Sequence, residues 1–224
     1  MRMKEEIRGI LEQMSFWNHL QDSEKDSLIQ SSRIMEYHAG EGVYSGGTQC
    51  LGMMAVLDGI LRTYLLSDEG KEVTIYRLRK GDVCVLAASC MLSAITFDVE
   101  MEAQTDTRIL LVPVWLLSKL QEENVYVENF IYKEAAKRFS DVIEALQQMM
   151  FLSLTQRIAS FLLDESAKQN TSSIFMTHEE IAKIIGSARE AVSRILKQMA
   201  KNGYISLNRG EIKIEEKAKL YQLL

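Results

Sequence analysis

Four polar side chains in the last fifth of the chain could read the edges of DNA bases. They lie within one stretch of six residues that lacks Gly and Pro: Arg189, Glu190, Ser193 and Arg194. An Arg can donate two hydrogen bonds to guanine, a Glu can accept one from the cytosine amino group, and a Ser can serve several base edges. A solvated, charged helix surface is the simpler alternative. Base reading requires a helix that presents these side chains together at its exposed N-terminal end.

Two capping boxes predict a helix pair that would position these side chains. In Thr177–Glu180 a Thr and a Glu stand three residues apart, so each can bind a free backbone amide at the start of a helix that ends at Gly186. Ser187–Glu190 repeats the spacing and predicts a second helix, which runs to Asn202 and stops at Gly203. Two capped helices joined at one Gly are typical of a helix-turn-helix.

A short hairpin is expected to follow the helix pair as a wing. Residues 204–207 and 211–214 have strand character, and the Asn-Arg-Gly turn at 208–210 joins them. Lys201 and Arg209 are expected to contact the DNA backbone or to remain solvated. Ser187, the expected cap of the second helix, belongs to the same candidate surface.

The charge is distributed in a way that suits this interpretation. The whole chain has a net charge of -5, which is unusual for a nucleic-acid binder. Residues 1–152 carry 15 Lys and Arg against 23 Asp and Glu, whereas residues 153–224 carry 11 against 8. The acidic total therefore hides a basic C-terminal part.

The remaining composition predicts a globular protein of two domains. The chain has 224 residues, of which 47% are hydrophobic and 25% charged, with one Pro. No apolar run approaches the roughly 18 residues that a membrane span needs. The charged start of the chain and an odd number of cysteines, three, lead us to expect free thiols and a cytoplasmic protein.

The segment before the basic part changes from β-rich to helical. Short helices are expected at about 4–14 and 23–31, and from 33 to 114 short β-rich runs alternate with Gly-containing turns, which indicates a β-barrel or double-sheet roll. Residues 125–152 lack Gly and Pro and predict a long helix. Its apolar residues recur at spacings of three and four, as in a coiled-coil dimer: Tyr132, Ala135, Phe139, Val142, Leu146 and Met149. Packing on the β-roll alone is the alternative.

These features predict an α+β fold with three parts. Residues 1–120 would form a jelly-roll-like, double-stranded β-helix domain, and residues 121–152 a dimerisation helix. Residues 153–224, which begin with a helix at 155–168, would form a winged helix-turn-helix DNA-binding domain.

The segment Ser-Ala-Arg-Glu-Ala-Val-Ser-Arg-Ile-Leu at 187–196 resembles the recognition helix of the cyclic-AMP receptor and fumarate-nitrate regulator (CRP/FNR) family. The resemblance extends to the cyclic-nucleotide-binding-like β-roll with its Lys-Gly-Asp turn at 80–82, the long helix and the wing. It implies a homodimeric transcription regulator on pseudo-palindromic double-stranded DNA, in which effector binding shifts the dimer to a DNA-binding state. Arg189 favours TGTGA-like half-sites. Contact with RNA polymerase is also implied, and either activation or repression would fit.

The sequence departs from the family's cyclic-nucleotide binders. Where they carry a Gly-Glu-Leu segment and an Arg-Ser pair for the phosphate, this chain has Val-Leu-Ala at 85–87 and Phe97-Asp98. Asp98 would repel a phosphate, and Val142 and Ile143 cannot offer side-chain hydrogen bonds to the base. The effector is therefore expected not to be cAMP. The family's iron-sulfur members need four Cys ligands, and three are too few.

Three interpretations of the sensor remain open. The first is a pocket for an unknown small molecule, lined by the residues around the expected effector site: Cys84, Leu86, Ser89, Cys90, Thr96 and Phe97. The second is a thiol switch that uses Cys84 and Cys90. The third is that both thiols are small buried hydrophobic residues.

The histidines do not indicate metal or enzyme chemistry. His19, His38 and His178 are scattered, without metal-ligand spacing to another His or Cys, whereas a cupin-like β-roll enzyme would need them clustered. We therefore expect no bound metal and no enzymatic activity. A haem-linked gas sensor needs only one axial ligand and stays an alternative without a supporting motif.

Overall fold

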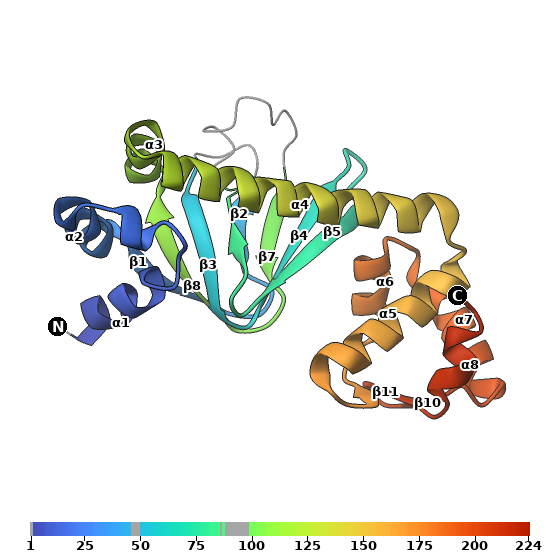
Figure 1. Ribbon diagram of the computed structural model, residues 1–224. Helices are drawn as coiled ribbons and strands as arrows, with labels where there is room; N and C mark the ends of the chain where they lie inside the picture. Colours follow the sequence, from blue (N-terminus) through green and yellow to red (C-terminus); the bar gives the residue numbers. More distant parts are fainter. Residues whose placement is uncertain (1, 46–49, 86, 88–98) are drawn as a thin grey trace. The chain divides into compact units, whose positions relative to one another are not determined.

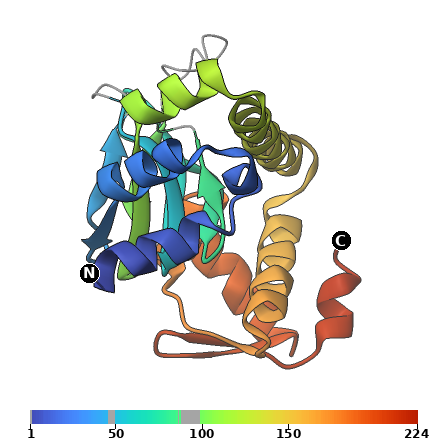
Figure 2. The ribbon, with the colours of Figure 1, turned by 60° about the vertical axis from the view of Figure 1, so that its left-hand side comes forward.

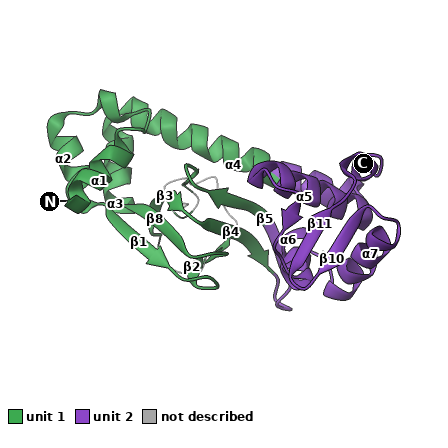
Figure 3. Ribbon diagram, turned by 90° about the horizontal axis from the view of Figure 1, so that it is seen from below, with its two compact units in different colours: residues 1–66, 75–142 green, residues 67–74, 143–224 purple. Residues whose placement is uncertain are grey.

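The computed structural model describes residues 2–45, 50–85, 87 and 99–224. These residues form two compact units (Figure 3). Unit 1 consists of Met1–Leu66 and Ile75–Val142, and unit 2 of Ser67–Thr74 and Ile143–Leu224.

Unit 1 contains the predicted β-roll (Figure 1). The described residues of the roll form two sheets, with the strand orders β1-β8-β3-β6 and β2-β7-β4-β5. The pairings β1–β8, β3–β8, β3–β6, β2–β7 and β4–β7 are antiparallel. The strands are β1 (Arg33–Tyr37), β2 (Gly42–Ser45), β3 (Gly52–Asp58), β4 (Ile60–Leu66), β5 (Glu72–Arg79), β6 (Val83–Cys84), β7 (Glu100–Ala103) and β8 (Thr107–Pro113).

Strand β3 shows why both faces of its sheet are apolar. Successive side chains of a strand point to opposite faces. Met54 and Val56 belong to the core of the roll, whereas Met53 and Ala55 belong to a second core that includes helix residues. Since both faces are covered, the strand is an almost continuous apolar run instead of an alternating one.

A buried ion pair joins β4 to β7. Arg62 and Glu102 stand opposite each other in the strand register, and Arg62 Nη1 donates to Glu102 Oε1 at 2.8 Å. The Arg62 side chain is only 2% exposed. Because an unpaired buried charge is strongly destabilising, this pair helps to fix the register of the two strands.

Helices cover the outer face of the β1-β8-β3-β6 sheet (Figure 2). They are α1 (Arg2–Leu11), the 3-10 helix η1 (Trp17–His19), α2 (Asp22–Ser31), α3 (Val114–Glu123) and the first part of α4 (Val125–Phe151). Their buried apolar side chains share one core with those of the sheet. The two N-terminal helices and the long helix were predicted, whereas α3 was not.

Unit 2 has the order of a winged helix-turn-helix. It contains α5 (Leu154–Gln169), β9 (Ser173–Ile174), α6 (His178–Ile185), α7 (Arg189–Lys201), β10 (Ile205–Asn208), β11 (Glu211–Ile214) and α8 (Lys217–Tyr221). Its described strands form a sheet in the order β10-β11-β9. The predicted helix pair and wing are thus confirmed, and β9 and α8 are additions. Within the described ranges, no helix has the length and apolar character that a bilayer span requires.

The conformation of Gly52 generates a stability prediction. Gly52 begins β3 with a φ of 137°, and a Cβ there would collide with the carbonyl oxygen of Val112 and lie 2.8 Å from the Val114 nitrogen. Gly52→Ala should lower the free energy of unfolding by about 2–4 kcal/mol, from backbone strain and overpacking. Urea denaturation followed by circular dichroism measures the change.

Gly42→Ala is the matched control, because Gly42 has open space around it and no positive φ. It should change the free energy of unfolding by no more than about 0.5 kcal/mol. Equal effects of the two substitutions would contradict the prediction.

Candidate nucleic-acid interface

Helix α6 begins with the predicted capping box. The Glu180 amide donates to Thr177 Oγ1 at 3.2 Å, and the Thr177 amide donates to Glu180 Oε2 at 2.6 Å. The Thr177 hydroxyl also donates to the same carboxylate oxygen, at 2.7 Å. Two amides that an uncapped helix would leave without partners are therefore bound, and the start of α6 is fixed.

The turn between α6 and α7 depends on Gly186. This residue has a φ of 68°, in the left-handed region, and its amide donates to the Ala182 carbonyl. Arg157 of α5 donates from Nη1 to the Ile185 carbonyl at 2.9 Å, which satisfies another carbonyl at the end of the helix. The expected C-terminal role of Gly186 is confirmed.

The predicted capping box at Ser187 is wrong. The Ser187 amide donates to the Ala182 carbonyl at 3.0 Å, so this residue still takes part in the termination of α6. Helix α7 begins one position later than a Ser187 cap would place it, with Ala188 as its N-cap and no side-chain hydrogen bond to the cap. The Ser187 side chain is half-buried ahead of the helix.

Helix α7 separates a buried face from a polar one. Val192, Leu196 and Met199 are buried in the core of unit 2. Three of the predicted base-reading side chains are exposed, namely Arg189, Glu190 and Arg194, and the fourth, Ser193, is half-buried. The structure therefore brings the four predicted residues together in the first two turns of one helix.

The cations of α7 and of the wing turn have no carboxylate partner among the described residues. In the described part of the chain, no ion pair involves any of the exposed residues Arg189, Arg194, Lys197, Lys201 and Arg209. By contrast, Lys213 lies 3.4 Å from Glu215 and Lys219 lies 2.7 Å from Glu216. Because the five exposed cations have no such partner among the described residues, the surface of α7 and of the wing turn is positively charged.

The wing hairpin is held by side-chain hydrogen bonds. Strands β10 and β11 pair antiparallel, and Gly210 has a φ of 75° in the connecting turn. Asn208 Nδ2 donates to Glu211 Oε2 at 3.1 Å. Hydrogen bonds from Ser173 and then Asn208 hold the pKa of Glu211 below its ordinary value. These contacts place Arg209 at the exposed tip.

The effector residues predicted in the β-roll are only partly described. Cys84 is a fully buried thiol outside any disulfide, and its Sγ lies 3.8 Å from the Tyr76 hydroxyl. Leu86, Ser89, Cys90, Thr96 and Phe97 lie outside the described residues. Cys50 is disulfide-bonded, which corrects the expectation that all three cysteines are free.

A buried guanidinium lies over the ring of Tyr76. The Arg138 side chain of α4 is 3% exposed; its Nη1 lies 2.8 Å from Asp141, and its Nη2 lies 3.8 Å from Asp82 of the Lys-Gly-Asp turn. The guanidinium carbon is 5.4 Å from the centre of the Tyr76 ring. Burial, and next the Cys84 side chain, raise the pKa of Tyr76 well above its ordinary value. The sequence reasoning missed this cluster, because heptad spacing considers apolar positions only.

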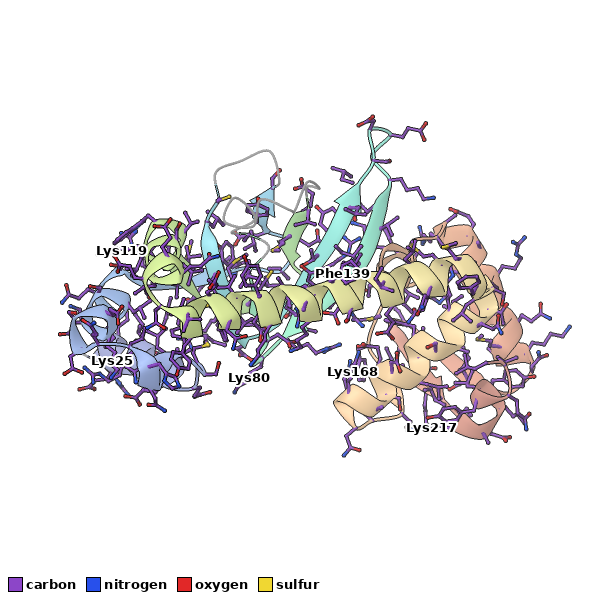
Figure 4. The ribbon with its side chains drawn as sticks, turned by 45° about the horizontal axis from the view of Figure 1, so that its top comes forward. Lys25, Lys80, Lys119, Phe139, Lys168 and Lys217 are labelled. Atoms are coloured by element: carbon purple, nitrogen blue, oxygen red, sulfur yellow. The ribbon has the colours of Figure 1, made fainter. Side chains whose placement is uncertain are left out.

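The prediction of an apolar seam on α4 is wrong at two of its six positions. Tyr132, Phe139, Leu146 and Met149 are exposed, but Ala135 and Val142 are half-buried against the cores of unit 1. Phe139 is labelled in Figure 4 and is 65% exposed. Ile143 and Met150, which lie outside the expected seam, are exposed as well.

Six exposed residues of α4 follow one heptad pattern. Their spacings alternate between four and three: Tyr132, Ala136, Phe139, Ile143, Leu146 and Met150. We name these six residues the α4 stripe. The same alternation is present in the sequence, but the sequence alone did not show which of two adjacent stripes the β-roll covers.

No metal site is found in the described ranges. Among these residues, no three His, Cys, Asp or Glu side chains are grouped so that they could hold a metal ion.

Two family models match the chain. Residues 34–124 match the cyclic nucleotide-binding domain, which places that model on the β-roll. Residues 156–223 match the Crp-like helix-turn-helix domain, which places that model on α5 to α8.

The chain is also similar to known regulators over most of its length. It is 37% identical to a solved protein from Eubacterium rectale that is assigned to the crp/fnr family of transcriptional regulators, with a TM-score of 0.88 and coverage of 93% of this chain and 97% of that one. It is 26% identical to the transcriptional activator protein anr of Pseudomonas aeruginosa, over 88% of this chain and 82% of the relative. It is 23% identical to the cAMP-activated global transcriptional regulator CRP of Salmonella typhimurium, over 80% of this chain and 88% of the relative.

The uncapped start of α7 generates a second stability prediction. Ala188→Ser would supply a hydroxyl at the N-cap, and it should raise the free energy of unfolding of unit 2 by about 0.5–2 kcal/mol. Thermal and urea denaturation measure the change.

Ser153→Ala is the converse control, because Ser153 Oγ accepts from the Gln156 amide at 3.3 Å at the start of α5. It should lower the free energy of unfolding by a similar amount. A loss on Ser153→Ala without a gain on Ala188→Ser would show that α7 does not begin as described.

Proposed function

Because the chain belongs to the CRP/FNR family of transcription regulators, we propose that it binds pseudo-palindromic DNA as a homodimer, with α7 of each protomer in the major groove. The observation that carries this proposal is the exposed face of α7, where Arg189, Glu190 and Arg194 have no ion-pair partner in the described part of the chain. Free hydrogen-bonding groups at the start of a recognition helix are what base reading requires.

The residues of this surface take two different roles in the proposal. Arg189 and Arg194 donate to guanine, Glu190 accepts from cytosine, and Ser193 contacts an adjacent base edge. Ser187, Lys201 and Arg209 contact backbone phosphates, which position the protein without reading sequence. The pair of Arg189 and Glu190 supports TGTGA-like half-sites. Selection of bound duplexes from a random library by the purified protein tests this proposal.

The α4 stripe is the proposed dimer contact. Five large apolar side chains of this helix are at least 36% exposed at heptad spacing, namely Tyr132, Phe139, Ile143, Leu146 and Met150. Apolar surface in such a row is costly in water, and a second α4 in a coiled coil would bury it. A dimer would also present two recognition helices to the two halves of a pseudo-palindrome.

The β-roll is proposed to bind a small molecule other than cAMP. Val142 of α4 is half-buried against the roll and offers no side-chain hydrogen bond to a nucleotide base. Activation by cAMP, for which the CRP relative is named, is therefore proposed not to extend to this chain. The effector would shift the dimer between two arrangements, of which one fits the DNA. A regulator of this kind needs no enzymatic activity. A DNA target supports a cytoplasmic location and contact with RNA polymerase as parts of the proposal.

A thiol-based sensor is the second candidate for the input. The disulfide at Cys50 is the observation that favours it. Full burial of Cys84 argues against that residue as the reactive thiol, because redox-sensing cysteines are accessible.

Substitution of Arg194 distinguishes base reading from electrostatic attraction to DNA of any sequence. Arg194→Ala should cost about 1–3 kcal/mol on the selected site and relax base choice at one position. Lys201→Ala, the control, should weaken binding to selected and random duplexes alike. Fluorescence anisotropy with both duplexes measures the effects, and an equal loss on both for Arg194→Ala would exclude base reading.

Phe139→Glu tests the α4 stripe. A charge at the centre of the stripe should convert the dimer into a monomer and weaken binding to the full pseudo-palindrome at least about tenfold, since the linked second half-site is lost. Sedimentation and anisotropy are the measurements. Lys133→Glu, at an exposed residue outside the stripe, should leave the dimer intact. A Phe139→Glu variant that remains dimeric would place the dimer contact elsewhere.

A further inference from the structure

Residues 67–74 belong to the same compact unit as the helix-turn-helix, although they lie far from it in the sequence (Figure 3). They connect β4 to β5 and include the start of β5. The Thr74 hydroxyl donates to the carbonyl oxygen of Lys183 in α6 at 3.0 Å, across 109 residues of sequence. Lys183 Nζ also lies 3.8 Å from Glu72 Oε2. Unit 2 therefore holds α6 through a segment that no local sequence pattern connects with it.

The hydrogen bond from Thr74 satisfies a carbonyl in the last turn of α6. The last carbonyl groups of a helix have no partner within that helix. The Ile185 carbonyl accepts from Arg157 of α5 at 2.9 Å. The Lys183 carbonyl accepts from Thr74. The end of α6 is thus bound by two side chains that come from other segments of unit 2.

Val73 packs against the turn that follows α6. A Cβ at Gly186 would lie 3.5 Å from both methyl carbons of Val73 and 3.9 Å from Met149 Cε. These are contact distances between apolar groups, so the Val73 side chain lies directly against the turn. Val73 and Thr74 are half-buried, whereas residues 67–71 are exposed. The half-buried end of the segment therefore makes the contact.

The turn that these contacts hold determines where α7 points. Gly186 has a φ of 68°, and α7 begins at Arg189, with Ala188 as its N-cap. Base reading needs side chains within about 0.5 Å of their productive positions, whereas the attraction between exposed cations and phosphates tolerates larger shifts. A looser turn would consequently weaken base reading more than it weakens binding to DNA of any sequence.

We propose that Val73 and Thr74 are positioning residues for DNA reading. They hold the end of α6 and the turn after it, and so place α7, without contacting the DNA themselves. This inference rests on the proposed function, because it needs α7 to read bases. It extends the reading machinery beyond residues 156–223, which match the Crp-like helix-turn-helix domain, to a segment inside the match to the cyclic nucleotide-binding domain.

The test measures the affinity of full-chain variants for the selected duplex and for a random duplex by fluorescence anisotropy. Thr74→Val removes the hydroxyl at almost constant volume. Its affinity for the selected duplex should fall about 3–10-fold, which corresponds to the net worth of one hydrogen bond. Its affinity for the random duplex should stay within about twofold of the wild type, because phosphate contacts do not depend on base reading. Thr74→Ser keeps the hydroxyl and should retain both affinities.

Two further variants test the packing contact. Val73→Ala removes the methyl groups that lie against Gly186 and should also lower the affinity for the selected duplex more than that for the random duplex. Glu69→Ala, at an exposed residue of the same segment, is the matched control and should change neither affinity. Sedimentation and thermal denaturation show whether each variant is folded and has the oligomeric state of the wild type.

Hydrogen exchange gives a readout without DNA. The amides of Gly186 and Ser187 both donate to the Ala182 carbonyl. They should exchange about 3–10-fold faster in Thr74→Val than in the wild type, because the local opening of the turn becomes easier. In Glu69→Ala their exchange should not change.

The outcomes distinguish this inference from the proposed function. A loss of equal size on both duplexes for Thr74→Val, or no loss on either, would overturn the positioning role and leave DNA recognition by α7 intact. Should Thr74→Val not fold, the two affinities of Val73→Ala decide in the same way. Failure of the wild type to prefer any duplex over random DNA would overturn both.

Discussion

Helix α4 carries apolar side chains on two faces, and water makes both faces costly to expose. One face is covered within unit 1, where Val127, Phe130 and Ile131 are buried. The other face is the α4 stripe, which the single chain leaves exposed. This constraint connects effector sensing with dimerisation, both of which are proposed for this protein. The same helix packs on the β-roll and offers the surface to which a second protomer would bind.

The recognition surface depends on how one turn distributes its backbone hydrogen bonds. The amides of Gly186 and Ser187 both serve the end of α6, and Arg157 satisfies a further carbonyl there. As a result, α7 starts at Arg189, and no side chain caps its start. Glu215 and Glu216 pair with Lys213 and Lys219, and Glu180 is bound by the Thr177 cap, so these carboxylates do not neutralise the cations of α7.

The interior of the β-roll combines an ordinary apolar core with a buried polar cluster. Tyr76 lies between Arg138, which is over its ring, and Cys84, which is next to its hydroxyl, and Asp82 and Asp141 supply the counter-charges of the guanidinium. Buried charges are tolerated only with such partners. Since Arg138 belongs to α4 and Asp82 to a turn of the roll, the cluster ties the long helix to the sensing domain of the same unit.

The sequence by itself determined the fold class, the helix pair with its Thr177 cap and Gly186 turn, and the group of Arg189, Glu190, Ser193 and Arg194. These features depend on the spacing of residues that are close in the sequence, so the sequence shows them directly. Only the tertiary structure decided the start of α7 and the face of α4 that remains exposed. Both depend on contacts between segments: the Ser187 amide is taken by α6, and the β-roll covers Ala135 and Val142 while it leaves Ile143 and Met150 in water.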